Sequence, residues 1–182
     1  DKLALVWNFL RTPMEKWYEL KDGHLALELR PQVADSLVNP SLVARRIEHI
    51  AFTASAKMKF SSRKSNEQAG MIVYRVSNGH IQFIKCGNEL VLVSTTRAGK
   101  KELARVPYKK AEVVLRIVSD GKDMRFYYGE SEDALTDMGV AQPLSIISDE
   151  KVSGGFNGPY VGMYATSNGK SSKSKVWFDW KD

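Results

Sequence analysis

The chain has 182 residues, a length that fits one domain able to bury roughly 70% of the surface that its unfolded chain exposes. A single cysteine, Cys86, excludes an internal disulfide, and no apolar run approaches the ~20 residues of a membrane-spanning helix. The net charge of +6 meets the first requirement of a nucleic-acid-binding protein, but the basic residues are scattered among acidic ones, so the sequence disfavours nucleic acid as a partner.

Apolar and polar residues alternate along the whole chain, which is typical of strands that bury one face. The expected inward residues, in chain order, are Leu25, Leu27 and Leu29 in segment 24–30; Ile50, Phe52, Ala54, Ala56, Met58 and Phe60 in segment 49–60; Ile72, Tyr74 and Val76 in segment 70–76; and Val113, Leu115 and Ile117 in segment 112–118. Segments 123–129 and 175–180 alternate in the same way, so they are predicted to be strands too.

Turn signals separate these strands at short intervals. Asn-Gly and Asp-Gly pairs tolerate positive φ, and turn sequences of this kind occur at 21–23, 77–79, 86–88 and 119–123. Helical signal is limited to one short turn in 131–138 and another beginning in 40–46. The predicted fold is therefore all-β: a two-sheet antiparallel β-sandwich of the jelly-roll kind, with residues 1–182 as a single domain.

Carboxylate pairs are the first candidates for catalysis, because a glycosidase acting alone needs two acids ~5 to 9.5 Å apart. Glu130 and Glu132 fall in a predicted loop, and Asp149 and Glu150 fall in a turn-like segment. Both pairs are better interpreted as solvated acids. The sequence therefore predicts no catalytic residue.

Metal-binding and nucleophilic motifs are equally sparse. The histidines His24, His49 and His80 lack the short spacing that zinc sites commonly use. His49 is expected to hydrogen-bond at a strand end. Cys86 lies beside Gly87 in a predicted hairpin turn and is interpreted as an inert thiol.

Asp179 is unusual because it stands between Phe178 and Trp180 on an otherwise apolar final strand. Carboxylates avoid burial unless they are paired or bind a cation. Three interpretations stay open: an outward and exposed side chain, a salt bridge, or a structural calcium ion held together with backbone carbonyls from the start of the chain. No other cofactor is expected.

Four tryptophans offer flat rings that could stack on sugars: Trp7, Trp17, Trp177 and Trp180. Aromatic residues of sandwiches mostly fill the core, however, so core packing is the stronger alternative.

Several segments, taken in order, carry a resemblance to a known family. They are WNFLRTP (7–13), WYELKDGHLAL (17–27), PSLVARRIEH (40–49), AFTASAKMKF (51–60), EQAGMIVY (67–74), GGFNGPYVGMYAT (154–166) and VWFDW (176–180). Together they resemble the C-terminal concanavalin A-like domain of family 43 glycoside hydrolases, which are β-xylosidases and α-arabinofuranosidases. The resemblance covers nearly the whole chain.

The resemblance implies a lectin-like sandwich that follows a five-bladed propeller, and the propeller holds the catalytic carboxylates and decides the sugar. It also implies that a sandwich loop with an aromatic tip helps to close the substrate pocket. The matching loop here is 155–158, which makes Phe156 and Asn157 the expected substrate-binding residues. Asn157 replaces the threonine that the family more often has.

The resemblance also implies a place at the domain junction for Arg46 and His49, although Ile47 and Glu48 stand where members commonly have glutamines. The expected function is that of a non-catalytic accessory domain, which braces the propeller and helps to bind xylo- or arabino-oligosaccharides. The expected location is the periplasm or the cell exterior; the first residues, DKLALVWNFLR, show no signal sequence, so the cytoplasm stays open. Two alternatives are a free-standing carbohydrate-binding module for hemicellulose and a catalyst within the sandwich.

Overall fold

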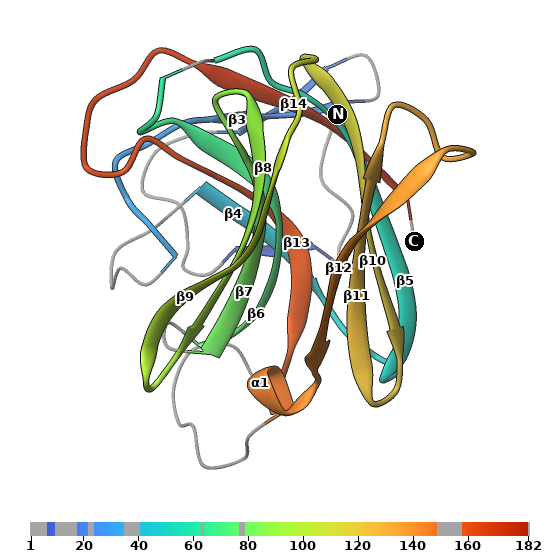
Figure 1. The fold of residues 1–182 in the computed structure, drawn as a ribbon. Helices are drawn as coiled ribbons and strands as arrows, with labels where there is room; N and C mark the ends of the chain where they lie inside the picture. The colour runs from blue at the N-terminus through green and yellow to red at the C-terminus, as the bar shows by residue number, and fades with distance from the viewer. Residues whose placement is uncertain are drawn as a thin grey trace.

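The fold is a sandwich of two antiparallel sheets packed face to face (Figure 1). The computed structural model describes residues 7–9, 18–21, 24–34, 41–62, 64–76, 79–148 and 158–181. Within these ranges each sheet has seven strands. The predicted two-sheet antiparallel sandwich is confirmed.

The two sheets are called sheet A and sheet B. Sheet A has the order β1 (Trp7–Phe9), β4 (Ser41–Arg46), β13 (Tyr160–Thr166), β6 (Gln68–Val76), β7 (Gly79–Cys86), β8 (Glu89–Thr96) and β9 (Gly99–Pro107). Sheet B has the order β12 (Leu135–Pro143), β11 (Asp123–Gly129), β10 (Glu112–Asp120), β5 (Ala51–Lys59), β14 (Lys175–Lys181), β3 (His24–Glu28) and β2 (Tyr18–Lys21). Because β5 pairs with both β10 and β14, segments far apart in sequence become neighbours.

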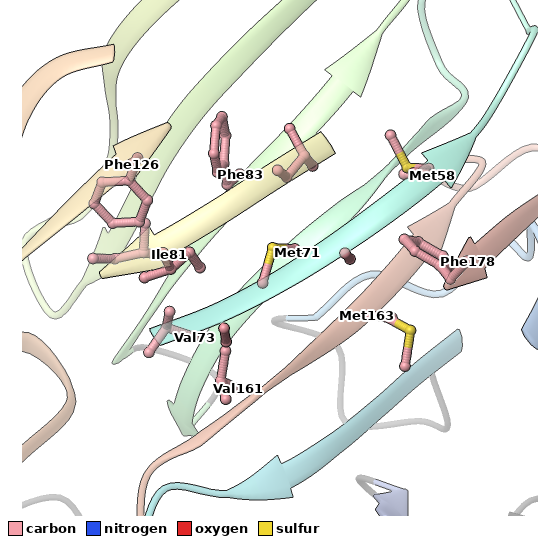
Figure 2. Packing of buried hydrophobic residues seen from close by; sticks show 14 of the residues in the cluster. Met58, Met71, Val73, Ile81, Phe83, Phe126, Val161, Met163 and Phe178 are labelled. Atoms are coloured by element: carbon pink, nitrogen blue, oxygen red, sulfur yellow. The ribbon is translucent and has the colours of Figure 1, made fainter. Parts of the chain in front are cut away.

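The main core lies between the sheets, and its side chains come from the inner face of each (Figure 2). The predicted inward residues of the segments at 24–30, 51–60 and 112–118 are buried there: Leu25, Leu27, Leu29, Ala54, Ala56, Met58, Phe60, Val113, Leu115 and Ile117. Phe83 of sheet A meets Phe126 of sheet B edge to face, with ring centroids 5.7 Å apart. Burying a side chain of this size contributes about 1.5–3 kcal/mol, so the core supplies most of the driving force for folding.

Sheet A departs from the prediction because both of its faces are buried. In β6, Met71 and Val73 face the main core, whereas Ile72 and Tyr74, which were expected there, face the other side. A second apolar cluster occupies that outer face: Ala34, Leu42, Ala44, Ile72, Tyr74, Ile84, Val91, Tyr160 and Tyr164. The Ala34 N–H donates a hydrogen bond of 2.8 Å to the Tyr164 hydroxyl. A strand buried on both faces is apolar at every position, and its alternation does not show which face is inward.

Three local predictions are wrong. Ile50 is 69% exposed, because β5 begins one residue later, at Ala51. The helices expected in 40–46 and 131–138 are instead β4 and a turn followed by β12. Pairing with neighbouring strands decides both segments against their local helical signals.

A short helix that the sequence did not predict, α1 (Ser145–Ser148), closes one end of the sandwich, where its Ile147 joins the main core. Among the described residues, no helix is long and apolar enough to cross a membrane.

Two predicted hairpin turns depend on glycine. Gly87 has a φ of 59° between β7 and β8, and Gly121 has a φ of 99° between β10 and β11. Glycine adopts these left-handed conformations without the steric cost that a β-carbon imposes. The turn signals at 86–88 and 119–123 are therefore confirmed.

Glu67 ties together the loop between β5 and β6 and the loop between β13 and β14. The residue is only 1% exposed, and its carboxylate accepts hydrogen bonds from the hydroxyls of Ser62, Ser172 and, at 2.8 Å, Ser174. Burial raises the pKa of Glu67, but the three serine hydrogen bonds and the charge of Lys64 outweigh burial and hold the pKa below its ordinary value of 4.5.

We expect Glu67→Gln to lower the free energy of unfolding by about 1–3 kcal/mol at neutral pH, because the amide nitrogen cannot accept the hydroxyl that it then faces. A carboxyl whose folded pKa is depressed stabilises the fold above its unfolded pKa, and that contribution is lost as the pH falls through the folded pKa. The difference between variant and wild type should therefore shrink in acid. Urea unfolding followed by tryptophan fluorescence, at neutral pH and at about pH 3, measures both effects.

Glu130→Gln is the control for this prediction. Glu130 is exposed and pairs with Lys110 at the surface, so its substitution should change the free energy of unfolding by no more than ~0.5 kcal/mol. Equal stability of Glu67→Gln and the wild type at neutral pH would contradict the role assigned to Glu67.

Candidate functional site

The candidate site lies at the end of sheet A where β4 ends and β13 begins. The two strands pair antiparallel, with Arg46 opposite Tyr160. One more hydrogen bond continues the ladder beyond the strands, since the Ile47 N–H donates to the Pro159 carbonyl at 2.9 Å. The segments RRIEH and GGFNGPY, which the sequence analysis considered separately, are therefore neighbours in the fold.

Gly158 makes the turn into β13 with a φ of 106°, in the left-handed region that favours glycine. The Arg46 guanidinium lies against this turn, because a β-carbon built on Gly158 would stand 3.3 Å from Nε of Arg46. The expected substrate-binding residues Phe156 and Asn157 lie outside the described residues. The structure shows the place at which their segment joins sheet A.

A row of polar and aromatic side chains crosses the outer face of sheet A from this turn. In register order the row, called the rim row below, comprises Arg46, Tyr160, Tyr74, His80 and Thr95. His80 is 0% exposed and stacks on Tyr74, with ring centroids 5.6 Å apart and planes 21° apart. Nε2 of Gln82 lies 3.3 Å from Nε2 of His80. Within the rim row, Tyr160, Tyr74, His80 and Thr95 are buried, and packing of this kind holds the start of β13, next to the turn, in place.

Sequence reasoning missed the rim row because its members come from five strands. One signal was available: His80 and Gln82 stand two positions apart in the otherwise apolar segment of β7. Residues two apart point to the same face of a strand, so this pair indicates a polar patch on one face of the sheet.

A hollow of about 250 Å³ opens beside the rim row, lined by residues 45–49, residues 51–54 and Val161. Arg46 and His49 are both exposed there. Their position at one end of the sandwich fits a contact with another domain, although that role stays a prediction.

Asp179 and the tryptophans divide between the two faces of sheet B. Asp179 points outward from β14 and stands opposite Lys57 of β5, and Trp177 lies on the same outward face. Trp180 faces the core and meets Trp7 edge to face, with ring centroids 5.1 Å apart. Trp17 lies outside the described residues. Core packing therefore explains Trp7 and Trp180, and Trp177 is left as a ring available to a ligand.

The calcium hypothesis for Asp179 stays a prediction, because the start of the chain, residues 1–6, lies outside the described residues. Within the part of the chain that the structure describes, no three His, Cys, Asp or Glu side chains gather as metal ligands.

The structure describes one of the two acidic pairs of the sequence analysis. Glu130 and Glu132 are exposed in the loop between β11 and β12, as predicted, and Glu130 pairs with Lys110 at 2.5 Å. Asp149 and Glu150 lie outside the described residues.

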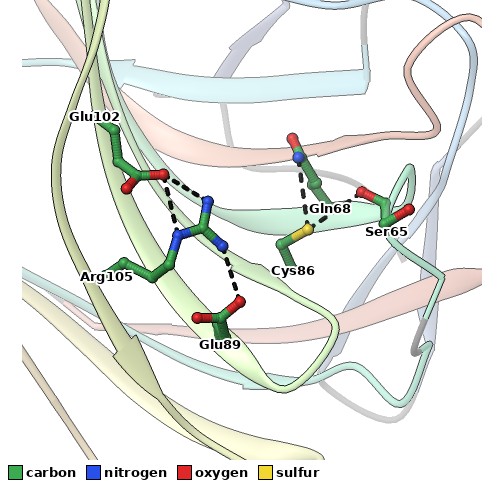
Figure 3. Close-up of polar contacts among 6 residues, drawn as sticks. All are labelled: Ser65, Gln68, Cys86, Glu89, Glu102 and Arg105. Atoms are coloured by element: carbon green, nitrogen blue, oxygen red, sulfur yellow. Dashed lines mark hydrogen bonds and ion pairs between the residues drawn. The ribbon is translucent and has the colours of Figure 1, made fainter.

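Cys86 ends β7 in a hydrogen-bonded position (Figure 3). Its thiol donates to the Ser65 carbonyl at 3.2 Å, and the Gln68 amide lies 3.7 Å from the sulfur.

Figure 3 also shows Arg105 between Glu89, at 2.9 Å, and Glu102, at 2.5 Å. The two acids offset the charge of the guanidinium.

Known proteins match the chain over its whole length. The family model described as the β-xylosidase C-terminal concanavalin A-like domain matches residues 1–182. The non-reducing end α-L-arabinofuranosidase BoGH43B of Bacteroides ovatus is 28% identical over 193 residues, covering 100% of this chain and 35% of that protein. A xylosidase/arabinosidase of Butyrivibrio fibrisolvens is 30% identical over 166 residues, covering 87% of this chain and 31% of that protein. The chain thus spans about a third of the length of these relatives.

Solved structures share the fold. The GH43 protein BlXynB from Bacillus licheniformis superposes with a TM-score of 0.92 at 26% identity, covering 99% of this chain and 37% of that chain. Xylan β-1,4-xylosidase from Bacillus halodurans C-125 has a TM-score of 0.88 at 25% identity, covering 98% of this chain and 36% of that chain.

Gly158→Ala tests the contact between the turn and Arg46. We expect faster amide hydrogen exchange at Ile47, because the added methyl strains a left-handed backbone and crowds the guanidinium that lies on the turn. The free energy of unfolding should fall by about 1–2 kcal/mol. Hydrogen exchange resolved by residue, together with urea unfolding, measures both changes.

Gly139→Ala is the matched control, because Gly139 has a φ of 83° and nothing lies within 4 Å of its added β-carbon. Gly139→Ala should lower the free energy of unfolding through the same backbone strain and leave amide exchange at Ile47 unchanged. Equal exchange at Ile47 in both variants would show that crowding of Arg46 has no effect.

Proposed function

The chain belongs to the family of β-xylosidase C-terminal concanavalin A-like domains, and on this premise we propose that it is the non-catalytic accessory domain of a longer family 43 glycoside hydrolase. In this proposal it braces a catalytic propeller and completes one wall of the sugar pocket. The family match over all 182 residues carries the proposal. Because the chain spans 35% of BoGH43B, the remainder of such a protein is the place for the catalytic carboxylates.

The turn at Gly158 supports the role in the pocket wall. A side chain that reaches into another domain needs a rigid base. If the loop that holds the side chain is mobile, part of the binding free energy is spent on ordering the loop. Here the Arg46 guanidinium lies on the turn, the Ile47 N–H donates to the Pro159 carbonyl, and the buried Tyr160 begins the strand that follows. We therefore assign substrate contact to Phe156 and Asn157: the phenyl ring lies against a sugar face and the amide exchanges hydrogen bonds with hydroxyls.

Arg46 and His49 complete the proposed junction with the catalytic domain. Both are exposed beside the hollow at the end of β4, next to the turn that leads to Phe156. A guanidinium offers several donors in a fixed plane, which suits the carbonyl and carboxylate groups of a facing domain.

The complete enzyme, in this proposal, acts on short xylo- or arabino-oligosaccharides. The names of its relatives include both an arabinofuranosidase and a xylosidase/arabinosidase. Hemicellulose, the polysaccharide from which such oligosaccharides come, is encountered outside the cytoplasm, so we place the enzyme in the periplasm or the cell exterior. Fractionation of cells that produce the protein tests this location.

Phe156→Ala in the full-length enzyme should raise KM for short xylo-oligosaccharides or arabinosides by about fivefold or more, with a smaller change in kcat. The physical reason is that the ring contributes binding surface to the pocket wall without touching the bond that breaks. Steady-state kinetics on the two substrate classes measure the change.

Phe156→Tyr keeps the ring and should stay close to the wild type. Lys101→Ala removes an exposed side chain from β9, which is an edge strand of sheet A and is separated from β13 by β6, β7 and β8, and it should leave KM unchanged. If Phe156→Ala has the kinetics of the wild type, the proposed role in the pocket wall is rejected. This result would not bear on the proposed bracing of the propeller.

A further inference from the structure

A groove crosses the outward face of sheet B, in the layer opposite the Gly158 turn. Its volume is about 520 Å³, and its lining side chains include His24, Lys57, Lys59, Glu112, Trp177 and Asp179. They come from β3, β5, β10 and β14, which lie side by side in the sheet. The accessory role proposed above does not use this groove.

Strand register arranges these side chains in two adjacent rows. In the first row, Glu112 of β10 stands opposite Lys59 of β5, and Lys59 stands opposite Trp177 of β14. Trp177 in turn stands opposite Ala26 of β3, whose side chain is a single methyl group. The first row therefore places a half-buried flat ring between charged groups and a small residue.

In the second row, Lys57 of β5 stands opposite Asp179 of β14. The same two residues also line a second hollow of about 280 Å³, which extends toward the loop at residues 130–133. The two hollows thus meet at Lys57 and Asp179. Together they form an elongated depression across the sheet instead of a single closed pocket.

The chemistry of the groove selects among ligands. Its two lysines are balanced by Glu112 and Asp179, and the adjoining hollow adds the acidic residues Glu130, Glu132 and Asp133, so the depression has no net attraction for a phosphate polymer. The carboxylates of the groove accept hydrogen bonds and its ammonium groups donate them. A sugar hydroxyl both donates and accepts, so sugar hydroxyls can pair with both kinds of group. The Trp177 ring offers the apolar face on which a pyranose or furanose ring stacks. A neutral polyol chain satisfies all of these groups at once.

We propose that this groove is a second glycan-binding site, which holds a neutral hemicellulose chain on the outward face of sheet B, in the layer opposite the Gly158 turn. Trp177 stacks on one sugar ring, and Lys57 and Asp179 bind hydroxyls of the next. The groove binds the polysaccharide, whereas the proposed pocket wall contacts short oligosaccharides. Experiments with the two kinds of ligand can therefore separate the two roles.

The test is affinity electrophoresis of the full-length enzyme in gels that contain soluble arabinoxylan, debranched arabinan or no polysaccharide. We expect at least one polymer to retard the wild type. Trp177→Ala should weaken the retardation constant by about fivefold or more, and Trp177→Phe, which keeps a ring, should lose much less. Asp179→Asn keeps the shape and removes the charge, and it should weaken retardation as well.

Lys101→Ala and Phe156→Ala are the controls, and both should be retarded like the wild type. Loss of retardation in Phe156→Ala would assign the binding to the catalytic pocket and overturn the proposal. So would a wild type that neither polymer retards, or a Trp177→Ala variant retarded as strongly as the wild type. A urea midpoint measured for each variant separates loss of the site from loss of the fold, and Trp177→Phe keeps the test valid if Trp177→Ala unfolds.

Discussion

The apolar contact between the inner faces of the two sheets is the interaction on which the rest of the structure depends. Leucine, methionine and phenylalanine side chains from both sheets meet in that core, and burying them drives folding. Because side chains alternate between faces, the core decides the direction of every other residue as well. Phe178 faces the core, and its neighbours Trp177 and Asp179 must then face outward. A slip of one residue would exchange the two sets.

The burial of both faces of sheet A follows from the same need to remove apolar side chains from water. Its outer face carries Ile72, Tyr74 and Tyr164, which are too apolar to face water, and Ala34 is one of the residues packed against them. At one end this cluster continues into the rim row, of which Tyr160, Tyr74, His80 and Thr95 are buried and Arg46 is exposed. Strands β4, β13, β6 and β7 of sheet A are thus buried on both faces, while the outward face of sheet B keeps the charged side chains that a solvated surface allows.

The two proposed sites use these layers differently. The turn at Gly158 leads into β13, whose residues are all buried, and dense packing of this kind limits movement. A pocket wall supplied to another domain benefits from that rigidity, because the geometry of a catalytic site tolerates little displacement. The groove around Trp177 lies on the solvated layer, where a long polymer has access without entering a pocket. One domain could in this way both complete a catalytic site and keep its polymer nearby.

Local patterns in the sequence were enough to predict the all-β class, the hairpin turns at Gly87 and Gly121, and the inward residues of the strands that bury one face. Period-two alternation within one segment predicts a strand and its inward face, and a single glycine in a turn sequence predicts a hairpin turn. The sequence also pointed to Arg46, His49 and the segment around Phe156, but as separate features. Only the tertiary structure placed Arg46 against Gly158, turned Ile72 and Tyr74 to the outer face of sheet A, and joined Lys57 to Asp179 in a groove. The physical reason is that strand pairing between distant segments decides which side chains meet, and no local pattern encodes the partner of a strand.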